Sequence, residues 1–435
     1  MPRILIICTT PFAGSMLAEG LKLSEGHVKM PYVTDIEVRA AEAGEFDAVR
    51  GVFSAAMMFE VTPDDLAQQL FEPERTLVAV DGGELIGTTL ALTRNLSVPG
   101  AVVPAAHVTG VGVRATHRRR GVLSRLMSRQ LREVPEAIAV LWASEPAIYG
   151  RFGYAAAAWG TSYEVDLHRV GPPTGPIRPG ELGELTKDEA LKELPRILGE
   201  MQRVRAGVSD RSELRWQKRL EDKPDDRGGR TALRIAVHRD ETGTVDGYAL
   251  WRGKMIWGPT GPAYEVNLEE LVAPTATAYR VLWQHLLTMD LSAKLGYGYA
   301  AVDEPLLQLV STPTALDRRV SESLWIRITD VQRALQERQY TVPLDVVLEV
   351  TDDLIEKNAG TFRLTASDSG VTCEPTDSPA DLTLSTTELS AAYLGGRPLA
   401  EFAATGRVTE HTTGALNQAT AAFRSPLAPV SVEVF

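Results

Sequence analysis

The chain has 435 residues, enough for about two or three domains, and its apolar content of 44% and charged content of 23% are those of a globular protein. A net charge of -12 excludes a general nucleic-acid binder, whose binding domain is basic, and we expect no nucleic-acid partner. Two cysteines are too few for a disulfide framework, so we expect a reducing cytoplasm. No apolar run approaches the roughly 20 residues that span a bilayer, and we expect no membrane partner.

Residues 1–29 are expected to be an N-terminal extension outside the catalytic fold. Their short apolar run "RILIIC" is below the roughly 7–15 residues of a secretory core. The segment that follows it, "TTPFAGS", lacks the G-x-G-x-x-G spacing of a dinucleotide site. A second methionine, Met30, precedes the first convincing domain start.

Residues 30–170 form the first predicted domain. Its elements alternate between strands, read from β-rich runs and the Asp-Gly-Gly turn at 81–83, and amphipathic helices. In chain order we expect a strand at 36–41, a helix at 43–57, a hairpin at 76–94, a strand at 106–113, a helix at 119–134, a strand at 137–144, a short helix and a last strand near 161–167.

A proline- and glycine-rich linker at 171–181 separates this block from a second one at 177–328. Residues 108–127 and 268–287 read as diverged copies of one strand–loop–helix unit, and the second copy lacks the basic run and the glycine. We therefore expect a duplicated domain with one working site. The third block, 329–435, alternates strand-like and helical runs and predicts an α+β layer.

The sequence Arg118-Arg119-Arg120-Gly121 lies between a strand and the start of a helix in the first block. The free N–H groups at a helix start bind anions, most often a pyrophosphate, and the arginines add charge and forked donors. Gly121 would let the backbone approach the phosphates closely. For a bare arginine run, a solvated basic turn is the simpler interpretation.

The stretch from Arg118 to Leu123 resembles the acetyl-CoA signature R/Q-x-x-G-x-G/A of the GNAT acetyltransferases, with Leu123 in place of the small residue. Together with "ASEPAIYGRFGY" at 143–154, the loop is similar to that of the Eis family of N-acetyltransferases. The resemblance implies an α/β (α+β) fold of two tandem GNAT-like domains with mixed central sheets, the second without a coenzyme site. It further implies a sterol-carrier-like α+β domain at the C-terminus and a homo-oligomer, a hexamer.

The resemblance also implies the residues that contact the cosubstrate acetyl-CoA, and it implies no metal. They are Val111, Gly112 and Val113 on the strand, Arg119, Arg120, Gly121, Val122, Leu123 and Ser124 around the pyrophosphate, and Ser144 and Glu145 beside the thioester arm. Two structural alternatives stay open, because the valines could simply fill the core and Ser144 could cap the next helix.

By the same resemblance Tyr149 is the general acid, and the C-terminal carboxylate of Phe435 reaches the first domain as the general base. An α-carboxylate with a pKa of about 3.5 is ionised at neutral pH and can accept the amine proton. His107 is expected to be structural. A frayed terminus is the alternative for Phe435, but "APVSVEVF" reads as a strand-like run ending on an aromatic residue.

We therefore predict an acetyl-CoA-dependent N-acetyltransferase that acts on a primary amine of a small molecule, with aminoglycosides among the candidates, or of lysine. Val434 stands where aminoglycoside-acetylating relatives carry a carboxylate, and Glu433 would point away in an extended segment, so a more apolar acceptor pocket is expected. The alternatives are a lipid- or sterol-binding protein and a scaffold built on inactive acetyltransferase folds.

Overall fold

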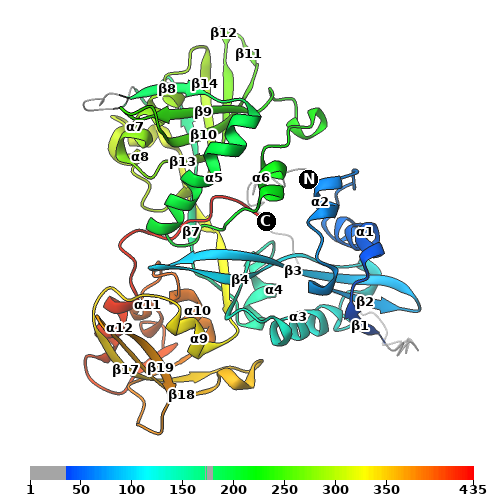
Figure 1. The fold of residues 1–435 in the computed structure, drawn as a ribbon, viewed down its shortest axis with the longest axis vertical. Coiled ribbons are helices and arrows are strands. Elements are labelled where there is room, and N and C mark those ends of the chain that lie inside the picture. The colour runs from blue at the N-terminus through cyan, green and yellow to red at the C-terminus, as the bar shows by residue number, and fades with distance from the viewer. Residues whose placement is uncertain (1–35, 172, 174–179) are drawn as a thin grey trace, which may run out of the picture.

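The computed structural model describes residues 36–171, 173 and 180–435, and the chain folds into three domains, each built on one large sheet (Figure 1). Two of these sheets have seven strands and the third has five. The expected extension, residues 1–29, lies outside the described residues. Among the residues that are described, no helix is long and apolar enough to cross a bilayer.

The first domain has helices on both faces of a sheet of order β1-β2-β3-β4-β5-β16-β6. Helix α3 lies so close to one face that a Cβ on Gly87 would meet Val122, and α1 approaches Gly112 on the other face in the same way. The elements are β1 (Glu37–Ala40), α1 (Phe46–Met57), α2 (Asp65–Gln69), β2 (Thr76–Asp81), β3 (Glu84–Val98), β4 (Ala101–Val113), α3 (Val122–Glu133), β5 (Ile138–Trp142), α4 (Pro146–Tyr149) and β6 (Ala155–Ala156).

The second domain repeats this plan around a sheet of order β15-β7-β14-β13-β10-β9-β8. Its elements are β7 (Trp159–Asp166), β8 (Glu181–Glu184), α5 (Lys187–Val204), α6 (Glu213–Arg219), β9 (Arg234–Arg239), β10 (Val245–Lys254), β11 (Trp257–Gly258), β12 (Gly261–Pro262), β13 (Tyr264–Val272), α7 (Ala276–Leu287), β14 (Ser292–Ala301), α8 (Leu306–Leu309), β15 (Arg318–Glu322) and β16 (Leu324–Ile328).

Two strands cross between these domains. Strand β7, which the sequence blocks place in the first domain, pairs with β14 and β15 in the second sheet. Strand β16 makes the reverse exchange and lies between β5 and β6 in the first sheet. Chain order cannot reveal this exchange, because a strand's partners depend on which sheet edge it reaches in space. The exchange ties the two domains into one unit.

The third domain packs helices against a sheet of order β19-β18-β17-β20-β21 and shares one apolar core with the first domain, in which Ile138 and Ile326 lie in the same cluster as Leu348. Its elements are α9 (Val331–Gln336), β17 (Leu344–Thr351), β18 (Gly360–Ser367), β19 (Gly370–Pro375), β20 (Leu382–Ser385), α10 (Thr386–Ala392), α11 (Leu399–Ala403), β21 (Val408–Glu410) and α12 (Ala415–Phe423).

An arginine fills part of the interior of the third domain. Arg338 is 1% exposed and donates to the backbone carbonyls of Tyr393 and Phe423 at 2.6 and 2.7 Å. Its guanidinium carbon lies 4.6 Å from the centre of the Phe423 ring and 4.7 Å from that of Tyr340. A desolvated cation stacked on aromatic faces is stabilised by the rings, so this part of the domain is packed with side chains.

A buried ion pair joins the exchanged strand to the third domain. Arg327 of β16 donates to both carboxylate oxygens of Asp352 at 2.6 Å, and the two side chains are 1% and 2% exposed. Asp352→Asn leaves a buried guanidinium without its counter-charge, so we expect a loss of roughly 3–5 kcal/mol of stability. Chemical denaturation measures the loss. Asp345→Asn, in a pair that is 54% exposed on both sides, is the control and should cost about 1 kcal/mol or less.

Candidate active site

Strands β4 and β5 part from one another at the centre of the first sheet. Their parallel pairing is limited to Ala106 with Ala139 and His107 with Val140, although β4 continues to Val113. Strand β4 has a β-bulge opposite β3 near the same point. Gly110 has φ 61°, and the pairing register between β3 and β4 shifts there. A glycine bulge of this kind bends and twists a strand. The edge of β4 that faces β5 is therefore not paired with β5 beyond His107, and its peptide groups can bind a ligand.

The three predicted strand residues lie on this edge. Val111 and Val113 are half-buried, and Gly112 is buried against α1. Val111 packs at the margin of the apolar cluster that contains Tyr149, so its side chain also fills core. The two interpretations of the valines are compatible, because a strand can pack its side chains and offer its backbone at the same time.

The basic loop ends where α3 begins. Gly121 is the N-cap with φ 78°, a conformation that other residues rarely adopt, and a Cβ there would point into open space. Arg119 and Gly121 are exposed, and Arg119 itself has φ 63°. Helix α3 is 12 residues long and has no acidic residue in its first turn. Its free N–H groups and the exposed guanidinium together favour an anionic ligand.

The sequence reasoning missed an acidic partner of this loop. The carboxylate of Asp81, at the end of β2, lies 3.2 Å from the Arg120 guanidinium and 3.3 Å from the ring of His117. Asp81 belongs to the Asp-Gly-Gly turn, and in the sequence only its turn chemistry is visible. The contact fixes one arginine of the run beside the helix start.

The other predicted contacts surround the same opening. These contacts include the first three residues of α3, of which Val122 is buried, Leu123 is half-buried and Ser124 is exposed. Ser144 and Glu145 are exposed after β5. The N-cap of α4 is Glu145 rather than Ser144, which removes the capping alternative for that serine.

Tyr149 ends helix α4 and is 6% exposed. Burial raises the pKa of its phenol, the hydroxyl of Ser144 opposes this through a hydrogen bond, and the charge of Glu145 raises the pKa further. The ring of Tyr154 packs edge-on against it at 6.1 Å between ring centres. Tyr149 therefore holds its proton at neutral pH, with a hydroxyl beside it to orient the phenol.

The C-terminal segment leaves the third domain and ends between the other two (Figure 1). Residues 428–435 form no strand, contrary to the strand-like pattern, yet Val430, Ser431 and Val432 are buried. The amide of Val430 donates to the carbonyl of Ala206 at 2.9 Å. The indole of Trp142 donates to the hydroxyl of Ser431 at 3.3 Å. Packing at a domain junction, not sheet pairing, orders this segment.

Phe435 lies on β4. A carboxylate oxygen of its terminus accepts a hydrogen bond from the hydroxyl of Thr109 at 3.0 Å, and its ring meets that of His107 at 4.5 Å between centres. The terminal carboxylate is thus held at Thr109, which lies two residues before Val111 on the strand that parts from β5. The frayed-terminus alternative does not describe this arrangement.

His107 has the structural role expected of it. It is fully buried, with Nδ1 3.0 Å from the carbonyl of Ala105 and Nε2 2.8 Å from the hydroxyl of Ser209. A carbonyl can only accept, so Nδ1 carries the proton and Nε2 accepts from the serine. Burial, and after it the charge of Arg94, holds the pKa of His107 well below its usual range. The ring is a neutral support for Phe435.

The corresponding place in the second domain is occupied by its own side chains. The hydroxyl of Thr275 accepts from the amide of Ala278 at the start of α7. Tyr279, aligned with Arg119, donates to Glu304. The segment 303–309 after β14 keeps the Glu-Pro of 145–146 but has Gln308 where the first domain has Tyr149.

Comparison with known proteins identifies all three domains. Residues 37–157 and 207–328 each match an acetyltransferase (GNAT) domain, and residues 331–431 match a sterol carrier protein domain. The chain is 40% identical over 374 residues to an uncharacterized N-acetyltransferase of Streptomyces avermitilis, which covers 84% of this chain and 90% of that protein. It is 30% identical over 377 residues to N-acetyltransferase Eis of Mycobacterium tuberculosis, which covers 81% and 89%.

Solved structures agree with these matches. Eis1 from Mycobacterium abscessus superposes with a TM-score of 0.79 at 31% identity, covering 92% of this chain and all (100%) of that one. A GCN5-related N-acetyltransferase from Anabaena variabilis gives a TM-score of 0.78 at 19% identity, which is a likeness of fold.

Proposed function

Since this chain belongs to the Eis-like GNAT N-acetyltransferases, with two GNAT domains followed by a sterol carrier protein domain, we propose that its first domain transfers the acetyl group of acetyl-CoA to a primary amine. The acceptor is a small molecule, with aminoglycosides among the candidates, or a lysine side chain. One observation carries the proposal most: the carboxylate of Phe435 is held by Thr109 on the strand that parts from β5.

The residues at this opening suit acetyl-CoA. Peptide groups of β4 from Val111 to Val113 would hold the pantetheine arm by hydrogen bonds, as a neighbouring strand would. The start of α3, with Arg119, Arg120 and Gly121, would hold the pyrophosphate, and the loop that carries Ser144 and Glu145 would flank the thioester. Acetyl-CoA supplies an acetyl thioester that is already activated, so the protein needs only to place the amine and move two protons.

The proposed chemistry is a direct transfer in a ternary complex. The carboxylate of Phe435 takes a proton from the acceptor ammonium, directly or through water, and the neutral amine nitrogen attacks the thioester carbonyl. The carbon–sulfur bond breaks, and Tyr149 gives its proton to the departing thiolate. The acetylated nitrogen and the protonated carboxyl group of Phe435 then each release a proton to solvent, and solvent returns a proton to Tyr149. The products are the N-acetyl amine, coenzyme A and one proton.

Release of coenzyme A in the presence of a panel of amines tests the proposal. The panel should hold aminoglycosides, arylalkylamines and lysine peptides, because Val434 is 54% exposed and gives the acceptor no charge at that position. Calorimetric titration with acetyl-CoA is the second measurement. Absence of both coenzyme binding and turnover would overturn the proposal, whereas binding without turnover would mean that the acceptor lies outside the panel.

Arg119→Ala combined with Arg120→Ala is expected to raise the Kd for acetyl-CoA. Each charge-assisted hydrogen bond contributes about 1.5–3 kcal/mol, so we expect a weakening of roughly tenfold or more. Calorimetry measures it directly. The matched control is the exposed pair Arg318→Ala with Arg319→Ala on β15, which should leave the Kd unchanged. An unaltered Kd in the loop variant would remove the pyrophosphate assignment.

The lipid-binding alternative gains no support from the part of the third domain around Arg338, since this side chain and the rings of Tyr340 and Phe423 fill it. We further propose a cytoplasmic homo-oligomer, a hexamer, on the family resemblance. Sedimentation equilibrium of the full chain tests the stoichiometry.

A further inference from the structure

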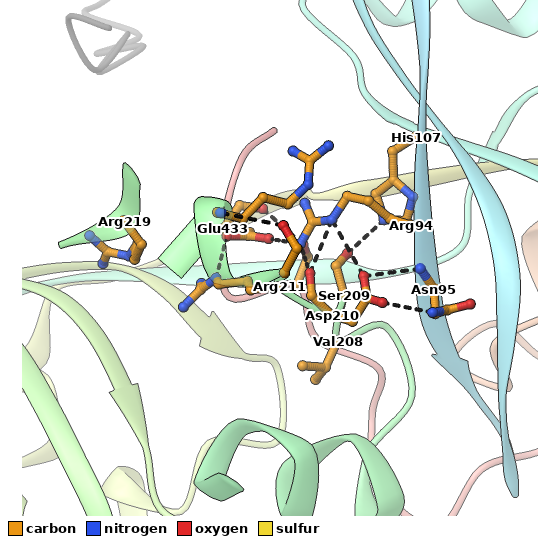
Figure 2. Close-up of polar contacts among 12 residues, drawn as sticks. Arg94, Asn95, His107, Val208, Ser209, Asp210, Arg211, Arg219 and Glu433 are labelled. Carbon is orange, nitrogen blue, oxygen red and sulfur yellow. Dashed lines mark hydrogen bonds and ion pairs between the residues drawn. The ribbon is translucent and has the colours of Figure 1, made fainter. Parts of the chain in front are cut away.

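All three domains meet at the carboxylate of Glu433. Arg94 of β3 in the first domain binds one of its oxygens, and Arg211 of the second domain binds the other at 2.8 Å from Nε (Figure 2). Glu433 itself belongs to the segment that comes from the third domain. Burial alone would raise the pKa of Glu433, but Arg211 and Arg94 lower it to about 2, so the group is ionised.

Arg94 also stands beside the chain terminus. Its side chain is 3% exposed, and its guanidinium carbon lies 5.8 Å from the centre of the Phe435 ring. Apart from Glu433, the described carboxylate paired with it is Asp210, at a looser 3.7 Å. The amide and side chain of Asn95 already bind Asp210 at 3.0 and 2.7 Å. Arg94 therefore depends on Glu433 for a close counter-charge.

We propose that Glu433 is a positioning residue that neutralises Arg94 and thereby leaves the terminal carboxylate of Phe435 free to act on the acceptor amine. The inference rests on the proposed function of that carboxylate. The ring of Phe435 lies beside the buried guanidinium of Arg94, and the side chain of Glu433 occupies that guanidinium. The terminal carboxylate is left with the weaker, neutral donor Thr109.

An unpaired Arg94 would make the terminal carboxylate a weaker base. A guanidinium within about 4–6 Å lowers the pKa of a carboxyl group by roughly 1–3 units, which makes it a weaker base. A buried arginine without a counter-charge is costly, so Arg94 would turn to the nearest free carboxylate if Glu433 were lost. A terminus paired in this way would neither bind a substrate ammonium nor accept its proton well.

The tail has other anchors besides Glu433. The guanidinium of Arg205 donates to the carbonyl of Ala428 at 3.1 Å, and the contacts of Val430 and Ser431 lie between that point and Glu433. Arg211 keeps both oxygens of Glu270 at 2.8 Å when Glu433 is changed. Loss of the Glu433 charge should therefore leave the tail in place and act mainly through Arg94.

The test compares Glu433→Gln, Arg94→Gln and the double variant in the full chain. We expect Glu433→Gln to lower kcat about tenfold or more, because a terminal carboxylate paired with Arg94 is a weaker base. The Kd for acetyl-CoA should be unchanged. The double variant should recover most of the lost rate, since no guanidinium remains to pair with the terminus. A crystal structure of Glu433→Gln should show Arg94 bound to the carboxylate of Phe435. Leu427→Ala, at an exposed position earlier in the same tail, is the control and should keep the wild-type rate.

Three results would overturn the inference. These are an unchanged kcat in Glu433→Gln, a double variant no faster than Glu433→Gln, and a terminus that has left Thr109 in the crystal. The last two would show that Glu433 only anchors the tail. The proposed function fails differently: in that case the wild-type protein binds no acetyl-CoA, or a chain blocked at Phe435 acetylates at full rate.

Discussion

Converting the α-carboxylate of Phe435 to a carboxamide is expected to lower kcat by about 100-fold or more, the usual contribution of a well-placed general base. The change keeps the ring on His107 and the hydrogen-bond acceptor for Thr109, and removes only the charge. Semisynthesis that ligates a short amidated peptide onto a truncated chain provides the variant. Coenzyme A release at saturating acetyl-CoA measures the rate, and the Kd for acetyl-CoA should not move.

Two related variants sharpen this result. Adding a short tag after Phe435 should be at least as damaging, because the tag must enter the junction between the domains. Deleting Phe435 places the carboxylate about 3.5 Å back along the chain, on Val434, and should also abolish turnover. The ligated chain with a free carboxylate is the control for the semisynthesis. Full activity in the amidated chain would remove the terminal carboxylate from the mechanism.

The local part of the site could be predicted from the sequence. Residues 106–134 carry a strand, a basic loop and an amphipathic helix in direct succession, and the glycine at the helix start predicts an anion site. The structure places β4, the loop and α3 as this pattern predicts. The family resemblance predicts Tyr149 as the acid, but the burial of Tyr149 and its bond to Ser144 depend on how α4 packs.

The long-range part could not be predicted, because it depends on contacts between domains. Glu433 was expected to point away from the site on the assumption of an extended strand, whereas the tail follows the domain junction and places it on two arginines. Those arginines, Arg94 and Arg211, belong to different domains and to no motif. Thr109 lies in the motif "VTGVGV", but its partner is 326 residues away in the chain.

The second domain differs from the first at the positions that correspond to the predicted site. Near the positions that correspond to the predicted coenzyme contacts, it has Thr275 capping its own helix and Tyr279 bonded to Glu304. On β13, Glu270 is fully buried and takes both hydrogen bonds from Arg211. Arg211, in the loop before α6, thus joins Glu270 of the second domain to Glu433 of the C-terminal segment. Through this arginine the second domain supports the C-terminal segment that reaches the first domain.

Tyr149→Phe is the second change with a large expected effect. Removing the phenolic proton leaves the thiolate without a donor, so kcat should fall by about 100-fold, while the buried ring and the Kd for acetyl-CoA are preserved. The wild-type rate should depend on the same group. Because the pKa of Tyr149 is raised above its ordinary value near 10, the phenol stays protonated up to that pH, and the rate should fall only above it.

Tyr154→Phe is the matched control for this experiment. Tyr154 is fully buried next to Tyr149, and among the described residues its hydroxyl has no hydrogen-bond partner. Removing that hydroxyl therefore sacrifices no bond and touches no reacting atom, so kcat should stay near the wild-type value. Equal losses in the two variants would mean that the aromatic pair is needed for packing. A loss confined to Tyr149→Phe, with an alkaline limb present in the wild type and absent in the variant, assigns the proton to Tyr149.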